Sequence, residues 1–239
     1  MPLCGGRAER YRLLAHVFQS EPSANELGAL VDWADGAGGG GSRVAGGVGG
    51  GVLDAPLAGT GATEGGGQAS ASEHEDRLRE QLRGFADHDL QALQTDIRTA
   101  YAELFVGPRP PLAPLYESLY RGFPRRLFTD VTRSVRDAYR RQGMEVAAKN
   151  RIPDDHLGFE LGFMACLCDK AQDAARAQSG QEEELLLRSA QQEFLSEHLA
   201  LWIGGFAAKV RAADTCGYYA AWADFAASHV EEDCRLGLL

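Results

Sequence analysis

The chain has little cysteine, an excess of negative over positive charge, and no long apolar run. Its 239 residues include five cysteines, an odd number with no Cys-x-x-Cys pair, so neither a zinc site nor a thioredoxin-like motif is indicated. No apolar stretch approaches the ~20 residues of a membrane span, and the N-terminus lacks the hydrophobic region of a signal peptide. We therefore expect a protein of the reducing cytoplasm without stable membrane insertion.

The charge balance limits the kinds of partner. Lys and Arg number 24 against 34 Asp and Glu, which gives a formal net charge of −10. This balance argues against non-specific binding to nucleic acid or to anionic membranes. It suits a basic partner, such as a peptide with paired arginines, although acidity also simply aids solubility.

Patterns of common catalytic sites are missing as well. There is no His-Glu-x-x-His, no Gly-x-Ser-x-Gly and no phosphate-binding Gly-x-x-x-x-Gly-Lys-Ser/Thr loop. Asp155, His156 and Glu160 are close in sequence, but three ligands on one helical turn are poor geometry for tetrahedral zinc. We predict that the protein is not an enzyme and holds no metal; an enzyme that uses the face of His156 and Glu160 is the least favoured alternative.

Helical periodicity runs along most of the chain. Residues 7–19, for example, place Tyr11, Leu14 and Phe18 on one face. The segment after Pro153 is apolar most of the way round, which is typical of a helix buried on several sides. Because strand-like alternation and internal repeats are absent, the sequence predicts an all-α fold, a single-domain helical bundle of about nine or ten helices over residues 1–239.

One segment interrupts this periodicity. From Gly36 to Gly67 roughly half of the residues are glycine, and such a composition buries too little apolar surface to offset its ordering entropy. We predict a disordered, flexible insert over residues 36–71 between two helices. A mobile lid is the alternative interpretation.

The late helices are less clearly delimited. The pattern predicts a helix from Glu182 to Leu199 with Leu185 and Leu186 in the core. The apolar pattern continues through Trp202, with a possible kink at Gly204-Gly205.

The most distinctive stretch is Tyr101–Tyr120, an apolar helix end followed by a loop with four prolines. Proline fixes φ and removes a backbone donor, so this loop is predicted to be stiff and extended. It ends on a cluster of aromatic and polar side chains together with the two residues before them: Pro114, Leu115, Tyr116, Glu117, Ser118 and Tyr120. The tyrosines either fill the core or form a surface that suits a partly apolar, partly basic peptide.

The second stretch is Pro153–Met164, which starts a helix. An aspartate at a helix N-terminus is favoured by capping and by the macrodipole, so Asp154 or Asp155 is expected to be the cap. His156 and Glu160 then lie one turn apart, where they could receive guanidinium groups or titrate near neutral pH. Function and simple capping both remain open from the spacing alone.

Three pieces in this order and spacing carry a family resemblance: Phe105-Val106-Gly107-Pro108, Pro111 to Tyr120, and Pro153 to Met164. They resemble the TorD/DmsD-type chaperones of molybdoenzyme maturation, in the NarJ-like superfamily, and the similarity runs from about Arg7 to Asp233 with a departure at the Gly-rich insert. The resemblance implies an all-helical, cytoplasmic chaperone. It would bind the twin-arginine leader and the apo form of a molybdopterin oxidoreductase, of the DMSO/TMAO reductase type, until the cofactor is in place.

The resemblance also implies a site. In the family the Asp-His pair, here Asp155 and His156, is implicated in leader binding. Glu117 and Asp155 are predicted to face the two arginines of the leader. The apolar stretch of the leader is predicted to lie along Leu115, Tyr116, Tyr120 and Phe163. The predicted peptide-binding set is Pro114, Leu115, Tyr116, Glu117, Ser118, Tyr120, Asp155, His156, Glu160 and Phe163.

A basic stripe on the predicted helix 129–142 is formed by Arg133, Arg136 and Arg140. Most such stripes are solvated faces. The sharper interpretation is a weak phosphate site for a guanine nucleotide or molybdopterin guanine dinucleotide, which has been proposed for some family members.

Two positions depart from the family pattern. Leu115 stands where a second proline usually precedes Tyr-Glu-Ser, and Ala200 stands where a proline often breaks the late helix, so that this boundary is expected to be smooth. The alternative function is an all-helical regulatory or adaptor protein unconnected with molybdoenzymes, and the sequence leaves monomer and dimer open.

Overall fold

The computed structural model describes residues 6–36, 71–121, 127–147, 151–177 and 180–237. The predicted Gly-rich insert, residues 36–71, lies outside the described residues except for its two ends.

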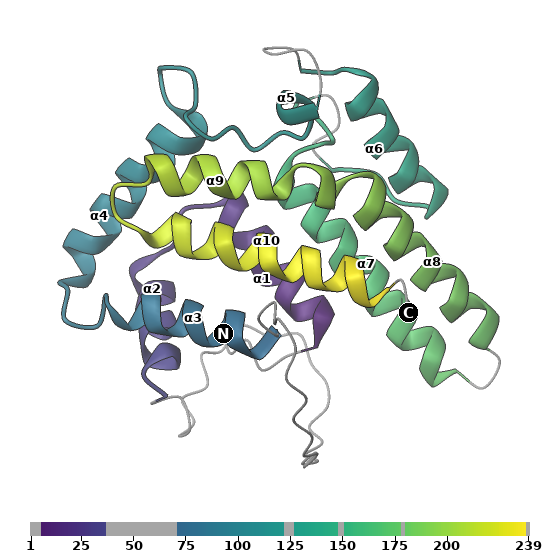
Figure 1. Ribbon diagram of the computed structural model, residues 1–239, viewed down its shortest axis with the longest axis horizontal. Helices are drawn as coiled ribbons and strands as arrows, with labels where there is room; N and C mark the ends of the chain where they lie inside the picture. Colours follow the sequence, from purple (N-terminus) through teal and green to yellow (C-terminus); the bar gives the residue numbers. More distant parts are fainter. Residues whose placement is uncertain (1–5, 37–70, 122–126, 148–150, 178–179, 238–239) are drawn as a thin grey trace, which may run out of the picture.

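The described chain contains ten α-helices (Figure 1). A π-helical turn and a 3-10 turn accompany them, and the only β-type pairing in the described part is an isolated bridge between Tyr116 and His156. The predicted all-α fold is confirmed. The helices are α1 (Arg7–Gln19), α2 (Ala24–Ala34), α3 (Ala71–Arg83), α4 (Leu90–Tyr101), α5 (Ser118–Arg121), α6 (Asp130–Arg141), α7 (Leu157–Arg176), α8 (Gln181–Glu197), α9 (Ile203–Ala213) and α10 (Tyr218–Leu236), with η2 (Ala102–Val106) and η3 (Leu199–Leu201).

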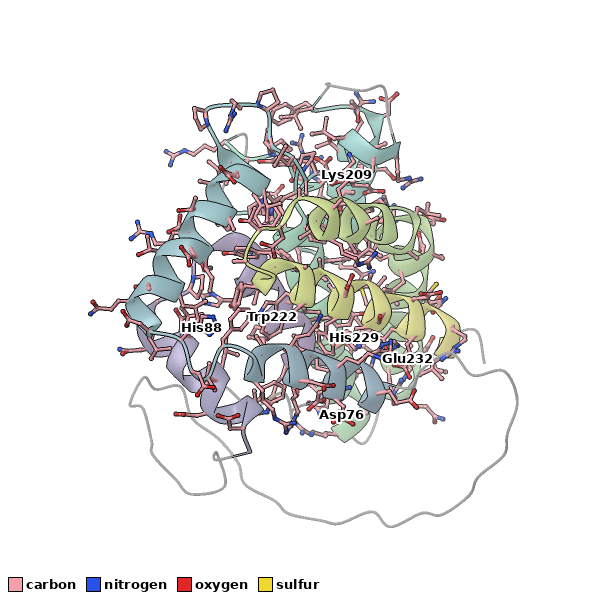
Figure 2. The ribbon with its side chains drawn as sticks, turned by 60° about the vertical axis from the view of Figure 1, so that its left-hand side comes forward. Asp76, His88, Lys209, Trp222, His229 and Glu232 are labelled. Carbon is pink, nitrogen blue, oxygen red and sulfur yellow. The ribbon has the colours of Figure 1, made fainter. Side chains whose placement is uncertain are left out.

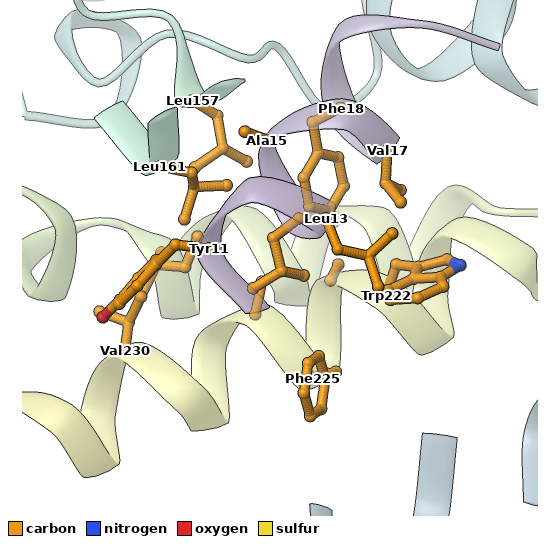
Figure 3. Close-up of a cluster of buried hydrophobic side chains, with 14 of the residues drawn as sticks. Tyr11, Leu13, Ala15, Val17, Phe18, Leu157, Leu161, Trp222, Phe225 and Val230 are labelled. Carbon is orange, nitrogen blue, oxygen red and sulfur yellow. The ribbon is translucent and has the colours of Figure 1, made fainter. Parts of the chain in front are cut away.

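Helix α7 is central to the packing because α1 and α8 both lie against it. Helix α10 lies between α9 and α3, as Figures 1 and 2 show, with Trp222 and His229 along its length. Figure 3 shows the core where three of these helices meet: Tyr11 and Phe18 of α1 lie near Leu161 of α7 and near α10. The apolar face of α1 and the nearly all-round apolar surface of α7 are thus buried against neighbouring helices, as the periodicity predicts. No helix in the described ranges is long and apolar enough to span a membrane.

The register of α8 differs from the prediction. Leu185 and Leu186 are exposed, at 62% and 66%, whereas Leu187 is buried. The run of three leucines leaves the inward face ambiguous, and packing against α7 selects the face of Leu187, Gln191 and Phe194.

The late helix also breaks, contrary to the smooth boundary expected at Ala200. Helix α8 ends at Glu197, η3 covers Leu199–Leu201, and α9 begins at Ile203, before the kink expected at Gly204-Gly205. His198 and Trp202, on either side of η3, have non-helical backbone angles (φ −125° and −138°) and buried side chains. This corner turns both side chains toward the two conspicuous sequence stretches.

Candidate functional site

The structure joins the two conspicuous stretches directly. The Glu117 amide donates to the carbonyl of Asp155 (3.0 Å), and the Leu157 amide donates to the carbonyl of Leu115 (2.8 Å), which forms the isolated antiparallel bridge. The Ser118 amide donates to Oδ2 of Asp155 (2.9 Å). The end of the proline-rich loop is therefore fixed on the first turn of α7.

The loop reaches this position by a tight exit from η2. The Gly107 amide donates to the carbonyl of Ala102 (2.5 Å), and a Cβ at Gly107 would lie 2.9 Å from that oxygen, so a side chain is excluded there. The Ala113 amide then donates to the carbonyl of Leu104 (2.9 Å). The loop is bound back onto the helix that it leaves.

His156, not an aspartate, caps α7. Its Nδ1 accepts a hydrogen bond from the Gly158 amide (3.1 Å). The predicted aspartate cap is wrong because Asp155 accepts from Ser118 and Asp154 binds Arg136, so both carboxylates are directed away from the helix end. Burial lowers the pKa of His156 to about 4, and the imidazole is therefore neutral at pH 7, as a cap that accepts through Nδ1 requires.

The arginine stripe of α6 is paired with carboxylates. Both Nε and Nη2 of Arg136 donate to Oδ2 of Asp154, at 2.9 and 2.6 Å. Arg133 binds Asp130 (2.7 Å), and Arg140 lies within 4 Å of two acidic side chains. Arg136 therefore supports the segment before α7, and the nucleotide interpretation stays a prediction that these contacts do not favour.

Two buried glutamates lie beneath the bridge. Nη1 of Arg121 contacts the carboxylate of Glu117. Oε2 of Glu117 also lies 3.0 Å from Nδ1 of His198. Because a carboxylate only accepts hydrogen bonds, Nδ1 of His198 must carry the hydrogen of this bond. Oε2 of Glu160 accepts from Nε1 of Trp202 (3.1 Å). Burial first, and then the charge of Glu117, raise the pKa of Glu160 well above its ordinary value.

The ten predicted peptide-binding residues divide into three groups. Glu117, Ser118, Asp155 and Glu160 are fully buried and form a polar cluster, beneath which His198 and Trp202 lie. Phe163 packs instead against Tyr139 and Phe194, with ring centroids 4.6 and 4.8 Å away, and does not line the loop. The others are Leu115, which is buried, His156, which is 9% exposed, and the partly exposed Pro114, Tyr116 and Tyr120.

Four buried polar atoms of this cluster have no hydrogen-bond partner within the described chain: Ser118 Oγ, Tyr120 OH, Asp155 Oδ1 and Glu160 Oε1. An unpaired buried polar group costs about 1–3 kcal/mol, so several of them in one place indicate a functional role. No group of side chains in the described ranges is arranged to hold a metal. A cavity of about 660 Å³ between α3 and α10 contains none of the predicted site residues.

Sequence reasoning missed Arg121, Arg136, His198 and Trp202 as members of this site. His198 and Trp202 are 81 and 42 residues from their glutamate partners. Neither carries a local signal, because each looks like an ordinary residue of an apolar helix. The helix break at η3 is what places them.

The sequence that forms this site matches a known family. The family model described as nitrate reductase delta subunit matches residues 68–208, which is more than half of the chain. The chain therefore belongs to this family, and the resemblance to TorD-type chaperones, inferred from its motifs, is confirmed.

Individual proteins that resemble this chain agree with the family assignment. The chain is 28% identical over 145 residues to a protein from Vibrio cholerae named "Chaperone protein TorD", covering 61% of this chain and 64% of the relative, just under two thirds of its length. A second Vibrio cholerae protein of the same name is 27% identical over 186 residues, covering 70% and 81%. One from Aeromonas salmonicida is 40% identical over 81 residues, covering 34% and 36%. These proteins are named as chaperones and not as enzymes, which agrees with the predicted lack of catalysis.

Proposed function

We propose that the protein is a cytoplasmic chaperone of molybdoenzyme maturation. It binds the twin-arginine leader and the apo form of a molybdopterin oxidoreductase, of the DMSO/TMAO reductase type, until the cofactor is in place. Family membership and the names of the relatives support the chaperone class. Leader binding is inferred from the chemistry of the site, and the type of client from the resemblance of the motifs.

The observation that carries the proposal is the environment of Asp155. Its Oδ1 has no hydrogen-bond partner, and no cationic side chain of the described ranges forms an ion pair with it, whereas Asp154 and Glu117 each have an arginine. A guanidinium group supplies the missing positive charge and the missing donor together. Asp155 is thus a buried carboxyl group of the cluster with no cationic partner among the described residues.

Tyr116 is a partly exposed side chain that interacts with Asp155. The Tyr116 ring is partly exposed and lies edge-on to His156, with centroids 5.3 Å apart. Burial, and then the negative charge of Asp155, raise the pKa of the Tyr116 hydroxyl, so this side chain feels the carboxylate beneath it. Since Asp155 is fully buried, side chains that cover it must move for an arginine to reach it, and we infer that Tyr116 is one of them.

Apolar side chains on the same loop suit the rest of a leader. Val106 and Leu112 are 61% and 54% exposed. A twin-arginine leader has an apolar stretch after its arginines, and such a stretch gains from covering exposed aliphatic groups. The segment from Val106 to the end of the loop therefore brings exposed aliphatic side chains close to the acidic cluster, as a peptide with an apolar stretch and two arginines requires.

The test is calorimetric titration of a client leader peptide, with its two arginines or with both replaced by glutamine. Asp155→Asn keeps the shape and an acceptor for the Ser118 amide but removes the charge, so affinity for the arginine leader should fall roughly tenfold, the loss of one charge-assisted hydrogen bond. Asp130→Asn, at a fully solvated carboxylate of α6, is the matched control and should stay within about twofold. Equal affinity for the two leaders would contradict the proposal.

The alternative, a regulatory or adaptor protein unconnected with molybdoenzymes, predicts no preference for paired arginines. A pull-down from the native host with the tagged chain separates the two. Recovery of a molybdoenzyme catalytic subunit supports the chaperone, and recovery of another partner without any such subunit supports the adaptor.

A further inference from the structure

Glu160 has an unusual environment for a carboxylate. It lies in the first turn of α7, is 0% exposed, and its one hydrogen-bond donor among the described residues is the Trp202 indole. Its Oε1 accepts no hydrogen bond from any residue that the structure describes. An ionised carboxylate accepts several hydrogen bonds, and burying it with a single neutral donor is strongly unfavourable.

The charged groups around Glu160 do not compensate for this burial. Glu117 and Asp155 interact with it, and so does Tyr139 of α6. Of the other ionisable groups on the surrounding elements, Arg121 and His198 are both directed to Glu117, and His156 accepts from the Gly158 amide. Within the described residues, Glu160 therefore lies near the carboxylates Glu117 and Asp155 and forms no ion pair with a cation.

We propose that Glu160 keeps its proton in the folded protein at neutral pH and donates it in a hydrogen bond to Glu117. Glu160 then acts as a positioning residue for the Tyr116–Ser118 segment and makes no contact with a bound peptide. This inference rests on the proposed function for the part that concerns peptide binding, and on the geometry alone for the part that concerns the proton.

A proton on Glu160 satisfies the contacts that ionisation leaves open. The hydroxyl donates to Glu117, while the other oxygen accepts from Trp202. Glu117 is then held by Arg121, His198 and Glu160, and its own amide binds the Asp155 carbonyl. The raised pKa of Glu160, caused by burial and by the Glu117 charge, agrees with this arrangement.

The first test compares thermal stability against pH. Glu160→Gln keeps the shape and a neutral donor but cannot lose a proton. A native state that binds one proton more than the unfolded state loses stability as pH rises above the ordinary glutamate value, by roughly 3–5 °C in Tm per pH unit for a chain of this size. We expect the Tm of Glu160→Gln minus that of the wild type to rise by at least about 3 °C between pH 5 and pH 8, whereas Glu183→Gln, at an exposed position of α8, leaves it constant. Parallel curves for the wild type and Glu160→Gln would overturn the proposal.

The second test needs no variant. In wild-type protein labelled with ¹³C-glutamate, one side-chain carboxyl carbon should keep the chemical shift of a protonated acid at pH 7. Its absence overturns the proposal even where Glu160→Gln fails to fold.

The third test concerns positioning. Glu160→Leu should lower affinity for the arginine leader at least fivefold, and Glu160→Gln should restore it. Failure of Glu160→Gln to restore the affinity lost in Glu160→Leu would overturn the positioning role. Absence of leader binding in every variant, with the Tm difference intact, would contradict the proposed function and leave the proton assignment standing.

Discussion

The three buried carboxyl groups of the site, Glu117, Asp155 and Glu160, differ in the donors that surround them. Glu117 has a guanidinium and an imidazole N–H, Asp155 has a backbone amide on one oxygen only, and Glu160 has one indole N–H. Because burial removes water from all three, these donors decide the state of each group. Glu117 is paired with Arg121 and His198, Asp155 has one oxygen available for a cationic ligand, and Glu160 is the group that keeps its proton in our proposal.

Trp202 gives a prediction at the scale of single residues. Trp202→Phe keeps an aromatic ring against Tyr120 but removes the donor to Glu160, so we expect a loss of about 1–3 kcal/mol in the free energy of unfolding. Trp33→Phe is the matched control, since Trp33 is also buried but its Nε1 has no hydrogen-bond partner within the described chain. Urea unfolding measures both, and equal losses would show that ring volume alone matters.

At the scale of elements, the first turn of α7 does several tasks at once. It carries its own cap, His156, receives the loop through the bridge, and contacts the end of α1, where Nε2 of Gln19 donates to the carbonyl of Gly158 (2.7 Å). A Cβ at Gly158 would lie 2.3 Å from Cγ of Gln19. The small residue at this position lets α1 approach the site closely.

The two glycines of α7 give a paired prediction. Gly162→Ala adds a methyl group that meets no described atom within 4 Å beyond its chain neighbours and the nearby backbone of its own helix, so it should stabilise the protein by about 0.5–1 kcal/mol through helix propensity. Gly158→Ala must displace the Gln19 side chain and lose its hydrogen bond, which cancels that gain and gives a net loss. Denaturant midpoints of the two variants check the signs, and stabilisation by both would show that the contact with α1 is dispensable.

At the scale of the whole molecule, buried titratable groups lie at several places in the bundle and give stability a pH dependence of both signs. Burial lowers the pKa of His156 and of His229, in α10, to about 4. These groups are neutral when folded, so the stability that they contribute is complete above the unfolded value near 6.5 and is lost as pH falls toward 4. Glu160 has the opposite sign, since its raised pKa means that stability is lost as pH rises.

The contribution of His156 to the loss of stability at acid pH can be measured separately with a variant. Asparagine is a good helix cap that does not titrate, so His156→Asn should keep the cap and remove this contribution. Between pH 7 and pH 5 the variant should lose roughly 2 kcal/mol less free energy of unfolding than the wild type. His88→Asn, at an exposed histidine, should follow the wild type. An unchanged slope in His156→Asn would show that folding does not lower the pKa of His156.

The sequence by itself determined the helical class and the two stretches that meet at the site. Periodicity marks which face of α1 is buried and shows that α7 is enclosed, because a helix must hide its apolar surface. The prolines of the loop and the order of the motifs likewise indicated where to look and which family to expect.

Only the tertiary structure decided what each polar residue does. An aspartate does not cap α7 partly because Arg136 of α6 binds Asp154, which leaves His156 as the cap. The charge of Glu160 depends on Trp202 and His198, which flank η3 and contact Glu160 and Glu117. The same holds for Leu185 and Leu186, whose exposure follows from the face that α8 turns to α7. Capping, charge and register are settled by competition among neighbours distant in sequence, and local propensity does not contain those neighbours.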